Sequence, residues 1–290
     1  MPGKTTSISV IKEQLIARNF APRKSLGQNF LTDDNILSKI ITAGDLGEND
    51  LVLEVGPGLG ALTEKLVERS KQVVAIEYDR GLFTILQEKF ADSKNLILFN
   101  QDILATDLAE ILKDYPREVY CYKVMANLPY YITTPVIFQL IESWLPWKTM
   151  VFLVQKEVAE RMVAGPGTKE YGALTVMLNF YGSVKKIGNV PKTVFYPNPQ
   201  VDSAIIQIKS YGRQDYSLVY PYLHRVVQAA FGQRRKTISN ALTSLGNSFE
   251  DKELTAELLR KSQIDPMRRG ETLSVEEFLR ISEELQIRSS

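Results

Sequence analysis

The sequence predicts a doubly wound α/β domain with a mostly parallel sheet, followed by a small all-helical domain. Through the middle of the chain, short runs rich in Val, Ile and Leu alternate with helix-period segments, whereas beyond about residue 211 only helical patterns recur. The length of 290 residues reaches the ~250 to 300 residues at which single cores tend to split. We therefore expect a first domain over residues 1–210, including an N-terminal helical extension, and a second over residues 211–290.

The apolar runs of the middle section are continuous rather than alternating, which indicates strands buried on both faces. Helix-period segments near residues 60–69, 80–90 and 134–143 separate them. This alternation is typical of a parallel sheet covered by helices on each side. The predicted strands are 51–55, 73–77, 96–99, 122–126 and 150–154.

A different pattern follows Gly172. An apolar helix runs through Tyr181, and two later strands, at 184–190 and 204–209, are joined by a Pro-rich connection. Strands joined in this way suit an antiparallel edge of the sheet. Beyond residue 211 the predicted helices lie near 217–231, 234–244, 252–261 and 274–285.

Composition excludes several classes of protein. No stretch approaches the ~18 consecutive apolar residues of a membrane span, and the N-terminus lacks the apolar block of a secretory signal. Cys121 is the only cysteine, which excludes an intrachain disulfide and a multi-cysteine zinc site. We expect a cytoplasmic protein without a metal or a membrane contact, although an organelle transit peptide stays open.

Cations are concentrated in two segments, although the net charge is only +1. Residues 1–25 hold five Lys and Arg against one acidic residue, and residues 182–240 hold nine against two. Because phosphate neutralisation is local, such an excess predicts a surface for a polyanion. A solvated face is the alternative.

A glycine-rich turn joins the first predicted strand to its helix. Gly56, Gly58 and Gly60 permit a tight turn and the close approach of a nucleotide-like ligand to the backbone. Glu77 ends the next strand, 21 residues after Gly56, where a carboxylate can accept both ribose hydroxyls of an adenosine. Both features also fit a nicotinamide dinucleotide, since Gly56, Gly58 and Ala61 satisfy the G-x-G-x-x-A pattern.

Two acidic residues favour S-adenosylmethionine over a nicotinamide cofactor. Glu54, two residues before the first glycine, suits the ammonium of a methionine and would repel a pyrophosphate. Asp102 and Ile103 follow the third strand, where they would hydrogen-bond an adenine amine and pack on its ring. The alternative for Asp102 is to cap the next helix.

The segment Asn127-Leu128-Pro129-Tyr130 follows the fourth strand and carries the most specific chemistry. An aryl exocyclic amine is a poor nucleophile because its lone pair is delocalised into the ring. Acceptors on the Asn127 side chain and the Leu128 carbonyl would draw the nitrogen toward a tetrahedral geometry. Pro129 rigidifies the turn, and Tyr130 would stack on the target base. The alternative is an ordinary strand-to-helix turn.

Together these segments resemble a known family. The motifs are Gly27-Gln28-Asn29-Phe30-Leu31, Glu54 to Gly60, Glu77, Asp102, Asn127 to Tyr130, and Phe195 to Ser203. Over nearly its whole length the chain resembles the KsgA-type small-subunit ribosomal RNA adenine dimethyltransferases and, more distantly, the Erm enzymes. The resemblance implies a Rossmann-like class I methyltransferase fold. It also implies transfer of methyl groups from S-adenosylmethionine to two adjacent adenosines in a hairpin near the 3′ end of small-subunit ribosomal RNA.

The resemblance adds site residues that spacing alone does not. In the family, the segment equivalent to Gln28, Asn29 and Leu31 covers the cofactor, and Asn127 adjoins it. Phe195, in the Pro-rich loop, is placed opposite the motif tyrosine as the second half of a clamp on an extruded adenine. From the sequence alone, Phe195 stays open as a core residue.

The resemblance also implies contacts with ribosomal RNA through residues 229–238 and 268–278, and hence the small ribosomal subunit as partner of a monomeric enzyme. One departure is Tyr131, where many members carry Asn. Two alternatives stay open: a nicotinamide oxidoreductase, and a ribosome-assembly factor without catalysis. The predicted RNA-contacting cations are Arg23, Lys24, Arg234, Arg235 and Lys236.

Overall fold

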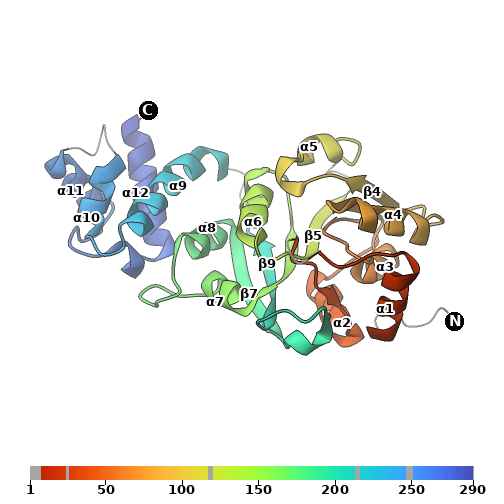
Figure 1. Ribbon diagram of the computed structural model, residues 1–290. Coiled ribbons are helices and arrows are strands. Elements are labelled where there is room, and N and C mark those ends of the chain that lie inside the picture. Colours follow the sequence, from red (N-terminus) through yellow and green to blue (C-terminus); the bar gives the residue numbers. More distant parts are fainter. Residues whose placement is uncertain (1–7, 24–25, 117–119, 213–215, 246–250, 290) are drawn as a thin grey trace. The chain divides into compact units, whose positions relative to one another are not determined.

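The computed structural model describes residues 8–23, 26–116, 120–212, 216–245 and 251–289. The chain divides into two compact units (Figure 1). The first consists of Met1–Ala159 and Lys185–Ser210, and the second of Glu160–Val184 and Tyr211–Ser290. The second unit therefore takes in a segment that precedes the last strands of the sheet.

A seven-stranded sheet of order β4-β3-β2-β5-β6-β9-β7 forms the centre of the first unit. The neighbours from β4 to β6 are parallel, whereas β9 runs antiparallel to β6, which confirms the predicted mostly parallel sheet with an antiparallel edge. The strands are β2 (Asp50–Val55), β3 (Gln72–Glu77), β4 (Leu96–Asn100), β5 (Cys121–Asn127), β6 (Thr149–Gln155), β7 (Gly182–Val190) and β9 (Ser203–Ser210).

The central strands are buried on both faces, as their continuous apolar sequences predict. Every residue of β2 is buried, and so are the last five residues of β3. Two helices, α2 (Asp34–Gly44) and α3 (Ala61–Val67), cover one face with side chains such as Ile40 and Leu66. Helix α2 was not among the predicted helices; Asp33 caps it by accepting hydrogen bonds from the backbone of Asn35 and Ile36.

Before the sheet, helix α1 (Ile8–Ala17) leads to the short strand β1 (Phe30–Leu31). Strand β1 pairs antiparallel with β8 (Phe195–Tyr196), so the N-terminal arm is tied to the Pro-rich loop. The remaining elements assigned mainly to this unit are α4 (Arg80–Lys89), η2 (Ile103–Ala105), α5 (Leu108–Ile111), α6 (Thr133–Glu142), α7 (Lys156–Met162), whose last three residues belong to the second unit, and η3 (Lys192–Val194).

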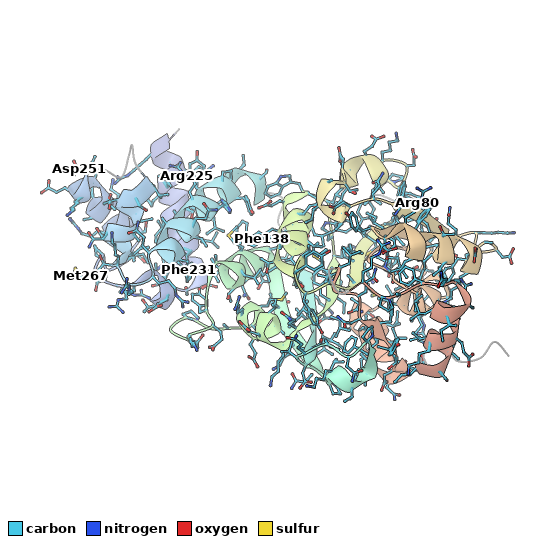
Figure 2. The ribbon with its side chains drawn as sticks, in the orientation of Figure 1. Arg80, Phe138, Arg225, Phe231, Asp251 and Met267 are labelled. Carbon is cyan, nitrogen blue, oxygen red and sulfur yellow. The ribbon has the colours of Figure 1, made fainter. Side chains whose placement is uncertain are left out.

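In its described residues, the second unit consists mainly of helices, together with the first residues of β7. Phe231, which is labelled in Figure 2, lies near the end of α9. Its ring lies 5.8 Å from the rings of both Tyr171 and Phe278 and so joins α9, α12 and the segment before α8 in one core. Its elements are α8 (Ala173–Tyr181), α9 (Tyr216–Gly232), α10 (Ile238–Leu242), η4 (Thr243–Leu245), α11 (Lys252–Lys261), η6 (Gly270–Thr272) and α12 (Val275–Ser289).

The predicted helix over residues 234–244 is wrong in its first part. Helix α9 ends at Gly232, and α10 begins only at Ile238, after a turn. Thr237 caps α10, and its side chain accepts a hydrogen bond from the Asn240 backbone. In the described part of the chain, no helix has the length and apolar character that a membrane crossing needs.

Candidate cofactor and catalytic site

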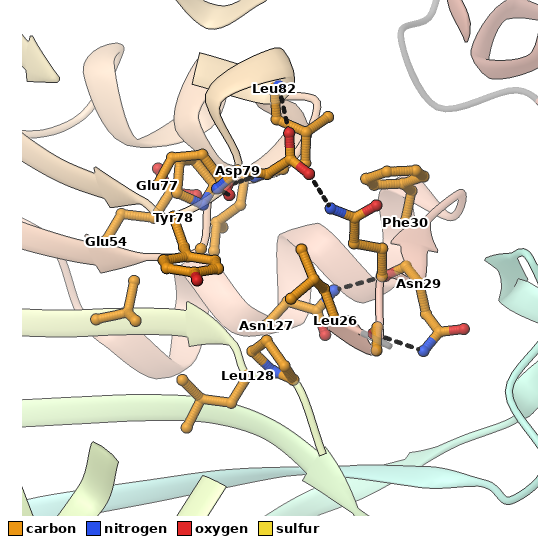
Figure 3. A pocket seen from close by; sticks show the side chains of 18 of the residues that line it. Leu26, Asn29, Phe30, Glu54, Glu77, Tyr78, Asp79, Leu82, Asn127 and Leu128 are labelled. Carbon is orange, nitrogen blue, oxygen red and sulfur yellow. Dashed lines mark hydrogen bonds between the residues drawn. The ribbon is translucent and has the colours of Figure 1, made fainter. Parts of the chain in front are cut away.

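A cavity of about 410 Å³ lies at the carboxyl ends of the parallel strands β2, β3 and β5 (Figure 3). Small-molecule sites in open α/β sheets form at this edge, and the volume fits their usual range of ~300 to 1,000 Å³. Most of the predicted site residues line it: Gln28, Asn29, Leu31, Glu54, Gly56, Gly58, Glu77, Asp102, Ile103, Asn127, Leu128, Pro129 and Tyr130.

The glycine turn after β2 has the backbone conformation that its sequence predicts. Gly56, Gly58 and Gly60 have φ values of 67°, 61° and 77°, in the left-handed region that favours glycine. Gly60 does not line the cavity: a Cβ atom there would lie 2.6 Å from the Phe90 ring. Its predicted contact with a cofactor stays a prediction, and its visible role is close packing against α4.

Glu77 is held at the end of β3 by two backbone donors. Its Oε2 accepts from the Gly58 amide at 3.1 Å and its Oε1 accepts from the Asp79 amide at 2.8 Å. Only 6% of the residue is exposed, and this burial raises the pKa of Glu77 to about 7. Each carboxylate oxygen has two lone pairs, so both oxygens retain capacity for a ligand hydroxyl.

Glu54 lies deeper in the same wall. Its Oε2 accepts a hydrogen bond from the Thr63 hydroxyl at 2.7 Å, and both side chains are buried. Burial raises the pKa of Glu54 to about 8. A cationic ligand group beside it would favour the ionised carboxylate and would be held by it.

Asn127 ends β5 and points into the cavity (Figure 3). Its Nδ2 donates to the backbone carbonyl of Asn29 at 3.0 Å. Because the amide is planar and its nitrogen is engaged, its Oδ1 is presented as the acceptor. The following residue, Leu128, donates its backbone N–H to Leu153 of β6, which holds the turn against the sheet.

Tyr130 is fixed by its hydroxyl group. The hydroxyl lies 2.8 Å from the hydroxyl of Ser203, a fully buried residue at the start of β9. Burial raises the pKa of Tyr130, so the phenol is neutral near pH 7. Ser203 belongs to the motif that carries Phe195, but no separate role was predicted for it.

Asp102 both lines the cavity and caps η2. One carboxylate oxygen accepts from the Leu104 amide at 2.9 Å. The capping alternative is therefore confirmed, while a contact with an adenine amine stays a prediction.

The structure does not bring Phe195 to the cavity. Phe195 pairs with Leu31 across β8 and β1, is 1% exposed, and packs in the core cluster that includes Ile40 and Ile205. Its role as a stacking partner of an extruded base stays a prediction.

The predicted RNA-contacting cations differ in how they are placed. Arg234 pairs with Glu271 at 3.3 Å and donates to the carbonyls of Lys169 and Tyr171. Arg235 and Lys236 are exposed, and neither forms an ion pair within the described residues.

At the N-terminal arm, Arg23 pairs with Asp79 at 3.2 Å, while Lys24 lies outside the described residues. Asp79 is a site residue that the sequence analysis missed. The described ranges contain no group of three or more His, Cys, Asp and Glu side chains arranged to hold a metal ion.

Comparison with known proteins decides the family. The model of the family described as ribosomal RNA adenine dimethylase matches residues 19–286. The chain belongs to this family. Ribosomal RNA small subunit methyltransferase A of Bacillus mycoides (strain KBAB4) is 46% identical over 268 residues, which cover 92% of each chain, and the protein of the same name from Bacillus cereus (strain B4264) has the same identity and coverage.

Two solved structures share the fold of this ribosomal RNA adenine dimethylase family member. A dimethyladenosine transferase from Plasmodium falciparum superposes with a TM-score of 0.76 at 27% identity, covering 90% of this chain and 98% of the other. The 23S rRNA methyltransferase ErmE gives a TM-score of 0.65 at 25% identity, covering 88% and 99%. The predicted resemblance and the Rossmann-like methyltransferase fold are confirmed, and the oxidoreductase alternative is excluded.

Proposed function

We propose that this chain is a ribosomal RNA adenine-N6 dimethyltransferase that modifies two adjacent adenosines of small-subunit RNA in the cytoplasm. The observation that carries the proposal is the placement of Asn127. Its amide nitrogen is engaged by Asn29 at 3.0 Å, and it faces a cavity that also holds Glu54 and Glu77. The 46% identity to proteins named ribosomal RNA small subunit methyltransferase A supports the choice of substrate.

The donor set of the cavity fits S-adenosylmethionine. Glu77 accepts the ribose hydroxyls beside its two backbone donors, and Glu54 holds the ammonium of the methionine tail. The left-handed glycines Gly56 and Gly58 let the backbone approach this ligand without a Cβ atom. When bound, S-adenosylmethionine supplies a methyl group on a sulfonium.

The chain's own residues act on the adenine amine. In the first of the two transfers, Asn127 Oδ1 and the Leu128 carbonyl accept hydrogen bonds from its two N–H groups, which draws the nitrogen out of conjugation and aims its lone pair. The N–CH3 bond forms as the donor's S–CH3 bond breaks, and one amine proton is released to water. In the second transfer the methylated amine has one N–H left, so one of the two acceptors holds it. Tyr130 stacks on the extruded base, and its hydroxyl is restrained by Ser203. This arrangement stabilises the amine most strongly as it becomes tetrahedral, so it accelerates transfer more than it tightens binding.

Mapping the methylated positions by mass spectrometry tests the proposal. The protein and S-adenosylmethionine are incubated with unmethylated small ribosomal subunits and, in a separate reaction, with large-subunit RNA. Two neighbouring dimethyladenosines in the small-subunit RNA are expected. Methylation confined to large-subunit RNA would assign the chain the specificity of an Erm enzyme, and methylation of neither RNA would contradict the proposal.

A further inference from the structure

The N-terminal strap, which we define as residues 26–31, forms one wall of the cavity and touches the catalytic turn. It lines the cavity from Leu26 to Leu31, and its Phe30 ring approaches the glycine turn, 3.3 Å from where a Cβ atom of Gly58 would lie. The Asn29 carbonyl accepts the hydrogen bond from Asn127. The orientation of the Asn127 amide therefore depends on where the strap lies.

One carboxylate, Asp79, fastens the strap. Its Oδ2 accepts a hydrogen bond from Gln28 Nε2 at 3.1 Å, and Figure 3 marks this bond with a dashed line at the labelled Asp79. The same oxygen lies 3.2 Å from Arg23 Nη1. Gln28 Oε1 in turn accepts from the Arg23 amide at 2.7 Å. Asp79 itself is 1% exposed, whereas the Arg23 side chain is 60% exposed, so the carboxylate is shielded from water and the guanidinium is not. The bond from Gln28 is part-buried, and its acceptor is a carboxylate, which makes it a charge-assisted hydrogen bond.

The other oxygen of Asp79 has a different task. Its Oδ1 accepts from the backbone of Gly81 and Leu82 at 2.8 and 3.2 Å and so caps α4. The arm preceding the strap docks on the same helix: Arg18 pairs with Glu88, and the Phe20 ring occupies the space that a Cβ atom of Gly81 would need. Asp79 therefore connects the strap to α4, because Oδ1 caps the helix and Oδ2 accepts a hydrogen bond from the strap.

We propose that Asp79 is a positioning residue for methyl transfer: it fastens the strap, and the fastened strap orients the Asn127 amide through the Asn29 carbonyl. The inference rests on the proposed function. A ligand held by Glu77 is enclosed by the strap, and the same closure completes the acceptor for the adenine amine, so the site is competent for transfer only when it is closed.

Asp79→Asn tests this with little change of shape. The new side chain keeps one oxygen to cap α4, since Asn caps as well as Asp. The other atom becomes an NH2 group that faces the donors of Gln28 and Arg23. We expect the turnover number at saturating RNA and cofactor to fall by about tenfold, as loss of one charge-assisted hydrogen bond predicts. Amide hydrogen exchange in residues 26–31 should accelerate, while the melting temperature changes little.

A second variant restores a donor and an acceptor between positions 79 and 28, with the two roles exchanged, and serves as the matched rescue. In Asp79→Asn combined with Gln28→Glu, the carboxylate introduced on the strap can accept from the new NH2 group, keeps an acceptor for the Arg23 backbone amide and returns the negative charge to this site. Slow exchange of residues 26–31 and most of the turnover should return. Gln28→Glu alone places two carboxylates together and should not improve on the wild type.

The side-chain amide of Asn127 gives a direct signal. Its ¹H–¹⁵N resonance, assigned by its loss in Asn127→Ala, should shift in Asp79→Asn and return in the double variant. In the Asn127→Ala background, Asp79→Asn should not slow single-turnover transfer further, because no amide is left to orient.

Wild-type turnover and wild-type exchange in Asp79→Asn would overturn the inference, as would a loosened strap with an unchanged Asn127 resonance. If Asp79→Asn fails to fold, Gln28→Leu removes the strap's side of the bond and is judged by the same signals. Unimpaired transfer in Asn127→Ala contradicts the proposed mechanism instead, so the two failures are distinguishable.

Discussion

The cavity of the first unit and the basic turn of the second unit, which we define as residues 233–237 between α9 and α10, use their ionisable groups in opposite ways. In the cavity, Glu54 and Glu77 are buried, hydrogen-bonded within the protein and raised in pKa. In the basic turn, Arg235 and Lys236 are exposed. A buried, restrained carboxyl group recognises one ligand geometry, whereas an exposed cation attracts any phosphate. Specificity should therefore depend on the cavity and salt-sensitive affinity on the turn.

The largest expected effect separates chemistry from binding inside the cavity. Asn127→Ala should lower the single-turnover rate by about 10² to 10³, by analogy with the loss of one preorganised hydrogen-bonding group. Affinities for S-adenosylmethionine and RNA should remain close to those of the wild type, since the acceptor matters most as the amine becomes tetrahedral. Rapid-quench kinetics at saturating RNA measures this. A wild-type rate would remove Asn127 from the mechanism.

Glu77→Ala should affect binding more than chemistry. The ribose hydroxyls lose a charged acceptor worth about 1.5 to 3 kcal/mol, which corresponds to a dissociation constant raised by roughly tenfold to a hundredfold. Isothermal titration with S-adenosylmethionine checks the value, and circular dichroism checks that the fold is retained. An unchanged dissociation constant would place the ribose elsewhere.

The raised pKa values of Glu54 and Glu77, about 8 and about 7, predict how ligand stabilisation varies with pH. Burial favours the protonated acids over the ionised ones. The contribution of these two groups to the stability of the unliganded fold is therefore complete below the ordinary carboxyl pKa, and it is lost as the pH rises through about 7 to 8. We expect S-adenosylmethionine to bind the ionised forms, so its affinity should increase about tenfold per group per pH unit below those values.

Melting curves at pH 6 and pH 8, with and without S-adenosylmethionine, provide the measurement. The increase in melting temperature caused by the ligand should be larger at pH 8. Glu77→Gln, which cannot ionise, should remove part of the difference. Equal ligand effects at both pH values would contradict the assignment of these carboxyls to the ligand.

The contrast between the two regions also bears on what a sequence can reveal. The strands and the turns at their carboxyl ends were predictable because each signal is local: glycines needing positive φ, an acid ending β3, and Asn127 after β5. The contact between Asp79 and the strap was not predictable, because its partner Gln28 is 51 residues away in the sequence. The residues next to Asp79 in the sequence indicate only a helix cap. The burial of Phe195 likewise depends on the pairing of β8 with β1.

Helix α2 is a different case, since its signal was present. Asp33 caps it, and Ile36, Leu37, Ile40 and Ile41 follow at helical spacing and are buried. For Arg234, no local signal distinguishes it from Arg235, because its partners Glu271 and Tyr171 come from distant parts of the sequence.

Substitutions can separate the two kinds of residue in the basic turn: Arg234, which is bonded within the second unit, and the exposed pair Arg235 and Lys236. The double variant Arg235→Ala, Lys236→Ala should show a shallower dependence of log affinity for small-subunit RNA on log salt. The magnitude of the slope should fall by about 0.7 to 0.9 per lost contact, without a change in the melting temperature. Arg234→Ala should instead destabilise the second unit by about 1 kcal/mol, since backbone carbonyls lose their donor. If the double variant retains the wild-type slope, the turn is a solvated face.

The smallest expected effect concerns Tyr130, an aromatic residue of the cavity that is restrained by a hydrogen bond in the same way as the two carboxyl groups. Tyr130→Phe keeps the stacking surface and removes only the hydroxyl bond to Ser203, which should slow single-turnover transfer by about two- to tenfold, the equivalent of one hydrogen bond. Ser203→Ala removes the same bond from the other side and should slow single-turnover transfer by a similar factor.

The double variant tests whether the two hydroxyls act together. Because both substitutions delete the same interaction, the double variant should be no slower than the slower single variant, whereas independent roles would multiply the two effects. Tyr130→Ala, which also removes the ring, should be slower than all three. Multiplied effects would show that the hydroxyls act separately and that the ring is held by its packing alone.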